Sequence, residues 1–247
     1  MVRVPQSEPS RVPESAPTAR LTVTIDHDYR APELRERAGG DFVSQERRGN
    51  TLWSVIGDVS AKASRGTFLA ERLRRSFAEE VKAEARPSDV LRALNGALID
   101  ELDGDPYGGG FATALVWRIG SDGSVVYASA GADAQYLVRD RRSMIVPCPG
   151  DLVLGLRRDT RYRDKARRLQ NGDVLIAFTD GVYESRDSVE RTRRLGIGVV
   201  LRTMEILTGG GMRPAARELF ERIDAFNGGR YDDDATILVA GMAASDQ

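Results

Sequence analysis

Four apolar stretches of this chain carry an aspartate at one end, and this pattern constrains the fold most strongly. Runs of this length and composition, bounded by turn residues, are typical of buried strands. The sequence therefore predicts strands that each place a carboxylate at a strand end. The stretches and their aspartates are residues 41–47 with Asp41, 51–56 with Asp58, 173–179 with Asp180, and 235–240 with Asp232, Asp233 and Asp234.

The first two of these strands are joined by Gly49-Asn50. A two-residue connection of this type between apolar runs predicts a tight β-hairpin. In such a hairpin Asp41 and Asp58 lie on neighbouring strands.

Gathering carboxylates is unfavourable, because each raises the pKa of its neighbours unless a cation offsets the repulsion. No Cys or His adjoins these aspartates, and oxygen-only ligation favours Mg or Mn over Zn. An aspartate beside a strand is often only a turn residue, and for any one of them alone that interpretation is preferred. For Asp58 and Asp180 together, each between an apolar run and a glycine, we favour a metal site.

Six short motifs occur in the order found in metal-dependent (PPM-type) serine/threonine phosphatases, and they resemble the bacterial SpoIIE-like branch in particular. An ordered set of six motifs is far more specific than one short pattern. The likeness extends over roughly residues 20 to 242. The motifs are Gly39-Gly40-Asp41-Phe42, Gly57-Asp58-Val59-Ser60-Ala61-Lys62, Phe111-Ala112-Thr113-Ala114-Leu115, Ala130-Gly131, Thr179-Asp180-Gly181-Val182-Tyr183-Glu184 and Asp233-Asp234-Ala235-Thr236.

The resemblance implies a site for two Mn or Mg ions. Asp58 would bridge both ions, with Asp180 as the other residue assigned a catalytic role. The resemblance also implies further ligands and nearby groups. These are the Val59 carbonyl and Asp41 on one side, Asp233 with Asp180 on the other, Thr179 and Thr236 as hydrogen-bond donors to ligands, and Lys62 as a phosphate contact or an exposed cation at a helix start.

The activity that the resemblance implies is hydrolysis of phosphoserine or phosphothreonine in a protein by a metal-activated water. The substrate would be a bacterial regulatory protein such as an anti-sigma antagonist. The chain departs from the family pattern at Ala61, Ala63 and Ala132, where the family usually has Gly, Gly and His. These changes motivate an alternative, a phosphatase-like module that docks phosphoproteins with little or no turnover. A third possibility, a nucleotide cyclase, is disfavoured because only one acidic residue separates Gly40 from Phe42.

Helical patterns interrupt the strands in pairs. Phe68, Leu69, Leu73, Phe77 and Val81 predict one face of a helix that runs to about residue 85. Pro87 then ends that helix, and Ser88 is a candidate cap for a second one. Residues 195–207 and 213–226 predict another pair, and residues 111–119, 124–130 and 135–139 predict an antiparallel meander. This order of strands and helix pairs along the chain predicts an α+β fold, a four-layer αββα sandwich of two antiparallel sheets flanked by helix pairs.

Composition limits the remaining possibilities. Residues 1–19 form an expected flexible Pro-rich tail, 20–242 the phosphatase domain and 243–247 a short C-terminal tail. With 36 basic and 37 acidic residues, nothing in the charge favours nucleic acid or a membrane surface as a partner. A single cysteine, Cys148, allows no disulfide within the chain, and no run of some 18 apolar residues could span a membrane. We expect a cytoplasmic protein.

Overall fold

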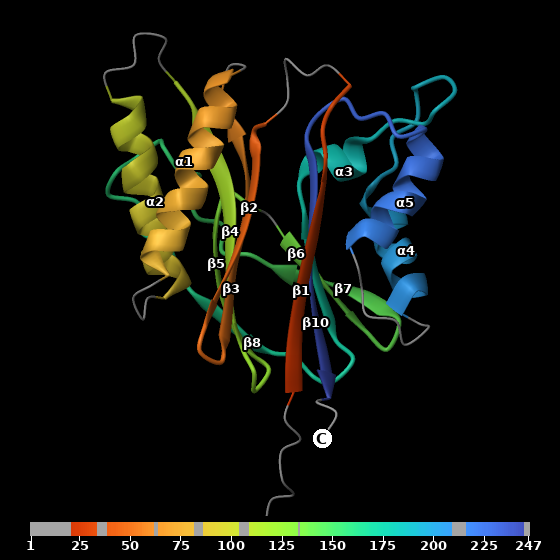
Figure 1. The fold of residues 1–247 in the computed structure, drawn as a ribbon, viewed down its shortest axis with the longest axis horizontal. Helices are drawn as coiled ribbons and strands as arrows, with labels where there is room; N and C mark the ends of the chain where they lie inside the picture. Colours follow the sequence, from red (N-terminus) through yellow and green to blue (C-terminus); the bar gives the residue numbers. More distant parts are fainter. Residues whose placement is uncertain are drawn as a thin grey trace, which may run out of the picture.

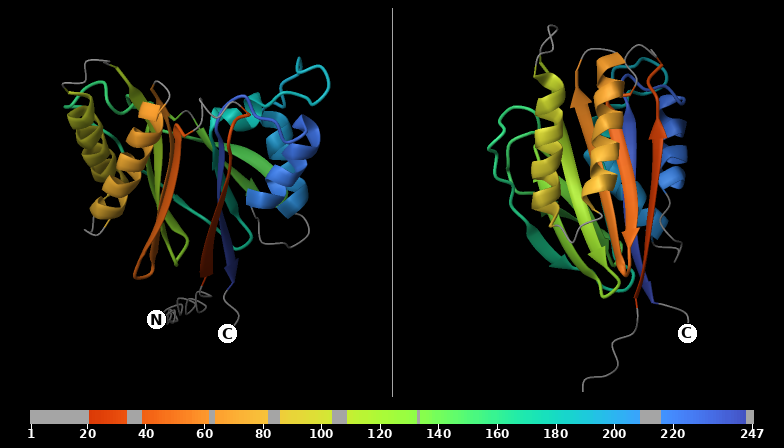
Figure 2. Two further views of the ribbon diagram at one scale, coloured as in Figure 1. Left: turned by 45° about the horizontal axis from the view of Figure 1, so that its top comes forward. Right: turned by 60° about the vertical axis from the view of Figure 1, so that its left-hand side comes forward.

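The structure is a computed structural model, and it describes residues 21–33, 39–61, 64–81, 86–103, 109–132, 134–208 and 216–244. The expected N-terminal tail, Lys62, Ala63 and residues 245–247 lie outside the described residues. Two five-stranded sheets pack face to face, and helices cover their outer faces (Figure 1). The two further views in Figure 2 show the same layering. The predicted four-layer α+β sandwich is confirmed.

All strand pairs of the first sheet are antiparallel, in the order β2-β3-β4-β5-β8. Helices α1 (Ser64–Glu80) and α2 (Pro87–Leu102) lie on its outer face (Figure 1). The strands are β2 (Asp41–Arg48), β3 (Thr51–Ser60), β4 (Phe111–Gly120), β5 (Ser124–Ala130) and β8 (Lys165–Arg168).

The second sheet is also antiparallel and has the order β1-β10-β9-β6-β7. Its outer face carries α3 (Asp180–Glu184), α4 (Ile197–Thr208) and α5 (Ala216–Asn227). The strands are β1 (Leu21–Arg30), β6 (Ala134–Arg139), β7 (Arg142–Pro147), β9 (Val174–Phe178) and β10 (Ala235–Ala244).

Apolar side chains fill each of the interfaces between layers. One cluster joins α1 and α2 to the first sheet, one lies between the sheets, and one joins the second sheet to α4 and α5. Leu69 and Trp117 are fully buried in the first and second of these clusters, and Phe220 in the third. Among the helices of the described residues, none combines the length and apolar character that a membrane span requires.

The predicted meander is wrong at its third strand. Residues 135–139 belong to β6, which pairs with β7 and β9 in the second sheet and not with β5. The chain leaves the first sheet at Gly131, whose φ of +72° suits a glycine and whose N–H donates to the Asp151 carbonyl at 3.0 Å. The sequence patterns also did not predict three short elements, β7, β8 and α3.

Two details of the first helix pair also differ from the prediction. Phe68 is 48% exposed and lies off the buried face, whereas Leu69, Leu73 and Phe77 are fully buried. Ser88 does not cap α2, because the helix begins at Pro87 with Arg86 as its N-cap residue. The Ser88 N–H and hydroxyl donate instead to the Asp164 carboxylate, at 2.8 and 2.9 Å.

Candidate active site

The aspartates at the strand ends come together at one end of the sandwich. In the hairpin register Asp41 of β2 lies opposite Asp58 of β3, as predicted. In the other sheet β9 pairs with β10, so Asp180, just after β9, lies beside Asp233, just before β10. The Thr179 N–H donates to the Thr236 carbonyl at 3.1 Å and ties these two segments together.

Asp41 connects the two sheets. Its side chain is only 6% exposed, and its Oδ2 accepts hydrogen bonds from the hydroxyls of Thr179 at 2.8 Å and Thr236 at 2.6 Å. Burial raises the pKa of Asp41 well above its ordinary value, with a further contribution from Asp58, while the two threonine hydrogen bonds act in the opposite direction. Both threonine hydrogen bonds thus favour the charged form of this buried carboxyl group, against the larger effect of burial.

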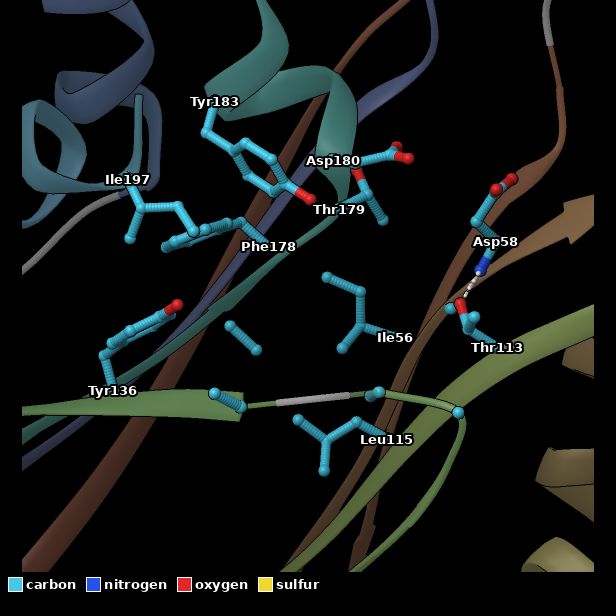
Figure 3. A pocket seen from close by; sticks show the side chains of 15 residues that line it. Ile56, Asp58, Thr113, Leu115, Tyr136, Phe178, Thr179, Asp180, Tyr183 and Ile197 are labelled. Carbon is cyan, nitrogen blue, oxygen red and sulfur yellow. Dashed lines mark hydrogen bonds between the residues drawn. The ribbon is translucent and has the colours of Figure 1, made fainter. Parts of the chain in front are cut away.

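Asp58 is the electrostatic centre of the group. Burial, followed by the nearby charges of Asp180, Asp233 and Asp234, raises the pKa of Asp58 to about 6. Its N–H donates to the Thr113 hydroxyl of β4 at 3.2 Å, which fixes the backbone at this point (Figure 3). The repulsion around Asp58 is the kind that a bound cation would offset.

Asp234 was not singled out from the sequence, yet it makes the most hydrogen bonds of the group. It is 2% exposed, and its Oδ2 accepts from the N–H groups of Gly39 at 2.6 Å, Gly40 at 2.7 Å and Asp41 at 3.4 Å. The Tyr29 hydroxyl donates to its other oxygen. Successive backbone amides form an anion-binding concavity, which here holds the chain's own carboxylate. Asp234 therefore fastens residues 39–41 to the second sheet.

The residue 39–41 loop lies directly against two of the predicted ligands. A Cβ atom on Gly40 would be 2.7 Å from Asp58 Oδ1 and 3.0 Å from the Val59 carbonyl oxygen. Only glycine lets the backbone come this close. The position of the loop is thereby coupled to the positions of Asp58 and Val59.

Gly181 allows an equally close approach on the other side of the site. A Cβ there would be 2.0 Å from the Asp234 carbonyl oxygen, which is backbone and has little freedom to move.

Gly181→Ala is expected to lower the free energy of unfolding by about 1–3 kcal/mol, the usual range for overpacking. Gly198→Ala in α4 is a matched control, because the new methyl group would meet no atom of another segment within 4 Å, and in this first turn it should stabilise by at most about 1 kcal/mol through helix propensity. Urea unfolding of both variants checks the opposite signs, and equal effects would contradict the close packing.

A cavity of about 260 Å³ opens beside the acidic group. Figure 3 shows Asp58 and Asp180 on one side of it and Tyr136 and Ile197 on the other. Thr179 also lines it, so the candidate site and the cavity share residues.

The donor set suits a hard divalent cation in its chemistry. Carboxylate and carbonyl oxygens from Asp58, Val59, Asp180 and Asp233 are the ligand types that Mg and Mn prefer. Within the part of the chain that the structure describes, no three acidic, His or Cys side chains lie close enough together as they stand to hold a metal ion. Asp180 and Asp233 are exposed, and the charges of both raise the pKa of Asp58, so both carboxylates lie within electrostatic reach of it.

The residues predicted from the sequence therefore lie in one region. Thr179 and Thr236 contact Asp41 and not the other aspartates, and Lys62 is outside the described residues. Asp234 had a signal in the sequence, as the third of three consecutive aspartates before a buried strand. Tyr29 had none, because one tyrosine in an alternating strand is not distinctive.

The comparisons with known proteins agree with this arrangement. The family model described as Stage II sporulation protein E (SpoIIE) matches residues 48–243, most of the chain. The chain belongs to the SpoIIE family. The predicted SpoIIE-like, PPM-type phosphatase family is thus confirmed.

Among curated proteins, phosphoserine phosphatase RsbU of Bacillus subtilis (strain 168) is 25% identical over 154 residues, which are 61% of this chain and 44% of RsbU. The chain thus spans less than half the length of that family relative.

Solved structures share the fold at low identity. The RsbU and RsbW domains of Rv1364c from Mycobacterium tuberculosis match with a TM-score of 0.74 at 22% identity, over 94% of this chain and 62% of that one. The PP2C phosphatase domain of SpoIIE from Bacillus subtilis, with a fragment of its regulatory domain, matches with a TM-score of 0.68 at 18% identity, over 92% and 65%. The SiaA-PP2C domain of Pseudomonas aeruginosa has a TM-score of 0.71 at 15% identity, over 90% and 86%. These likenesses show that the family member has the PP2C-like fold.

Proposed function

We propose that this chain is a metal-dependent protein phosphatase that hydrolyses phosphoserine or phosphothreonine. The observation that supports it most is the group of carboxylates around Asp58, where burial and then the charges of Asp180, Asp233 and Asp234 raise the Asp58 pKa to about 6. Bound Mn or Mg, with two ions proposed, would supply a water activated near neutral pH and would offset charge on the phosphoryl group.

The residues of the chain have distinct tasks in this proposal. Asp58, the Val59 carbonyl, Asp180 and Asp233 would hold the ions. Asp41 is buried and accepts hydrogen bonds from Thr179 and Thr236, so it orients this end of the two sheets and would support the ion site from behind the other ligands. No side chain of the protein needs to act as a nucleophile.

The proposed substrate is a phosphorylated regulatory protein, such as an anti-sigma antagonist. RsbU is named a phosphoserine phosphatase, and this chain matches less than half of that protein. The transfer of its activity to this chain is accordingly part of the proposal, as is the choice of substrate class.

The test is release of phosphate from a phosphoserine peptide and from p-nitrophenyl phosphate, with Mn and with EDTA. Asp233→Asn should lower Mn-dependent turnover about 10–100-fold, since even groups that only orient metal ligands have effects of this size. Asp232→Asn is the matched control, because Asp232 is its exposed neighbour and pairs with Arg186 and Arg191. Its turnover should stay close to that of the unmodified protein.

Two outcomes would contradict the proposal. A Mn-loaded protein with no turnover of either substrate would favour the alternative, a docking module, especially if it still bound the phosphopeptide. Equal losses in the Asp232 and Asp233 variants would mean that the Asp233 carboxylate has no special role.

A further inference from the structure

The cavity beside the acidic group has two chemically different ends. Asp58, Thr179 and Asp180 line the polar end. The rest of the lining is mainly apolar and includes Ile56, Leu115, Tyr136, Phe178, Tyr183 and Ile197, here called the aromatic pocket, with the Tyr183 hydroxyl pointing toward Thr179 (Figure 3). Figure 3 shows these side chains converging on the same space from the two sheets and from α3 and α4.

The wall of the aromatic pocket is already ordered. The rings of Tyr136 and Phe178 stack with centroids 5.2 Å apart and planes 7° apart. Tyr183 meets Phe178 edge-on at 6.1 Å. Stacked rings on neighbouring strands hold one another in place, so a ligand would find the surface largely preformed.

Charge indicates which part of a substrate the pocket can accept. None of the described residues that line the cavity is Lys, Arg or His, whereas Asp58 and Asp180 stand at its polar end. A phosphate pushed into the apolar end would lose its hydration without gaining a cation. The phosphate therefore belongs with the metal ligands, and the aromatic pocket suits an uncharged group attached to it.

Size favours a side chain over a whole small molecule. The cavity measures about 260 Å³. Pockets for small-molecule ligands are usually larger, about 300–1,000 Å³. One large apolar side chain close to the phosphorylated residue matches both the volume and the apolar lining.

We propose that the aromatic pocket is a specificity subsite for a large aliphatic or aromatic side chain of the phosphoprotein, next to or within a few residues of the phosphorylated serine or threonine. This inference rests on the proposed phosphatase function. It adds a preference of the site for certain residues near the phosphorylated serine or threonine of the substrate. Recognition of this kind combines a phosphate held by metal with a side chain held by burial.

The test is a set of phosphoserine peptides, otherwise composed of Ser, Gly and Ala, in which one Leu is moved through each position from −3 to +3. The best Leu peptide should exceed the peptide without Leu by about 10-fold or more in kcat/KM, the range expected for burying added methylenes. Binding of fluorescein-labelled versions, measured by anisotropy, should show the same order of preference. The binding arm decides the inference even if turnover is absent.

Pocket variants make the test specific. Ala132→Leu adds a side chain at a residue that lines the cavity, so it should shift the preference from Leu to Ala at the selected position. Ile197→Ala enlarges the pocket and should shift the preference from Leu toward Phe or Trp. Val199→Ala is the matched control on the same helix, since Val199 is 51% exposed and does not line this cavity. Its preference should equal that of the unmodified protein.

The outcomes of these tests distinguish failure of the proposed subsite from failure of the proposed phosphatase function. Turnover of p-nitrophenyl phosphate without any Leu preference would overturn the subsite and leave the phosphatase proposal standing. A preference that both Ala132→Leu and Ile197→Ala retain would place the selecting surface elsewhere and would also overturn it. A Leu preference in binding, lost in the pocket variants but without turnover of any substrate, would support the subsite and contradict the hydrolase.

Discussion

Asp58→Asn is expected to reduce Mn-dependent phosphatase turnover by about 100-fold or more. Losing a group that merely orients a metal ligand typically costs about 10–100-fold, and Asp58 is proposed to be a ligand of both ions. Asparagine has nearly the same shape and keeps the backbone N–H that donates to Thr113. The variant should therefore fold. Phosphate release at saturating Mn measures the effect, and turnover within about threefold of the unmodified protein would exclude Asp58 from the ion site.

The same substitution is expected to stabilise the metal-free protein at neutral pH. The pKa of Asp58 rises from 3.8 to about 6 in the fold, chiefly through burial and then through Asp180 and Asp233. Between these two values the folded state binds more protons than the unfolded state, so the free energy of unfolding falls as pH rises and stays lower above pH 6. Well below pH 3.8 the group is protonated in both states and has no effect. Asparagine has no such titration.

Urea unfolding in EDTA at pH 4 and pH 7.5 checks this sign. Relative to the unmodified protein, Asp58→Asn should be more stable at pH 7.5, by up to about 3 kcal/mol from the size of the pKa shift, and close to it at pH 4. Asp159→Asn is a control in which the pKa shift has the opposite sign. The exposed Asp159 pairs with Arg157, which lowers the Asp159 pKa, so this substitution should not stabilise the protein at pH 7.5. A destabilised Asp58→Asn protein at pH 7.5 would contradict the repulsion inferred from the structure.

Asp234→Ala is expected to lower the free energy of unfolding by about 3 kcal/mol or more. The change would leave the N–H groups of Gly39 and Gly40 and the Tyr29 hydroxyl without their acceptor. A hydrogen bond to a charged group contributes about 1.5–3 kcal/mol, and these three partly exposed donors would recover some of that loss from water. Asp234→Asn keeps an oxygen that can accept from the two glycines, so its loss should be smaller, and Tyr29→Phe should lose about 1 kcal/mol because it removes one donor only.

A measurement at single residues distinguishes a change in the residue 39–41 loop from a change in the stability of the whole fold. Amide hydrogen exchange at Gly39 and Gly40 should be fastest in Asp234→Ala, intermediate in Asp234→Asn and slowest in the unmodified protein. Because Gly40 lies against Asp58 and Val59, release of the loop should also weaken Mn binding about 10-fold in Asp234→Asn. Unchanged exchange at both glycines in every variant would show that Asp234 does not hold the loop.

Much of the candidate site was predictable because its signals are local. The Gly49-Asn50 turn and the lengths of the flanking runs determine that Asp41 faces Asp58, since a hairpin register follows from its turn. The apolar runs that end at Asp180 and begin after Asp233 likewise predicted strands β9 and β10. The prediction failed at residues 135–139, because alternation identifies a strand and does not say which sheet it joins.

The sequence alone determined most of the strands, the helix pairs, the family motifs and the carboxylates at the strand ends, because each of these depends on residues within a short segment. The tertiary structure decided that Asp234 holds residues 39–41 and that Tyr29 supports it. It also decided that aromatic side chains from β6, β9 and α3 close a pocket beside Asp58. These contacts join residues as far as 205 positions apart, and their geometry follows from how two sheets twist and pack against each other, which no local pattern encodes.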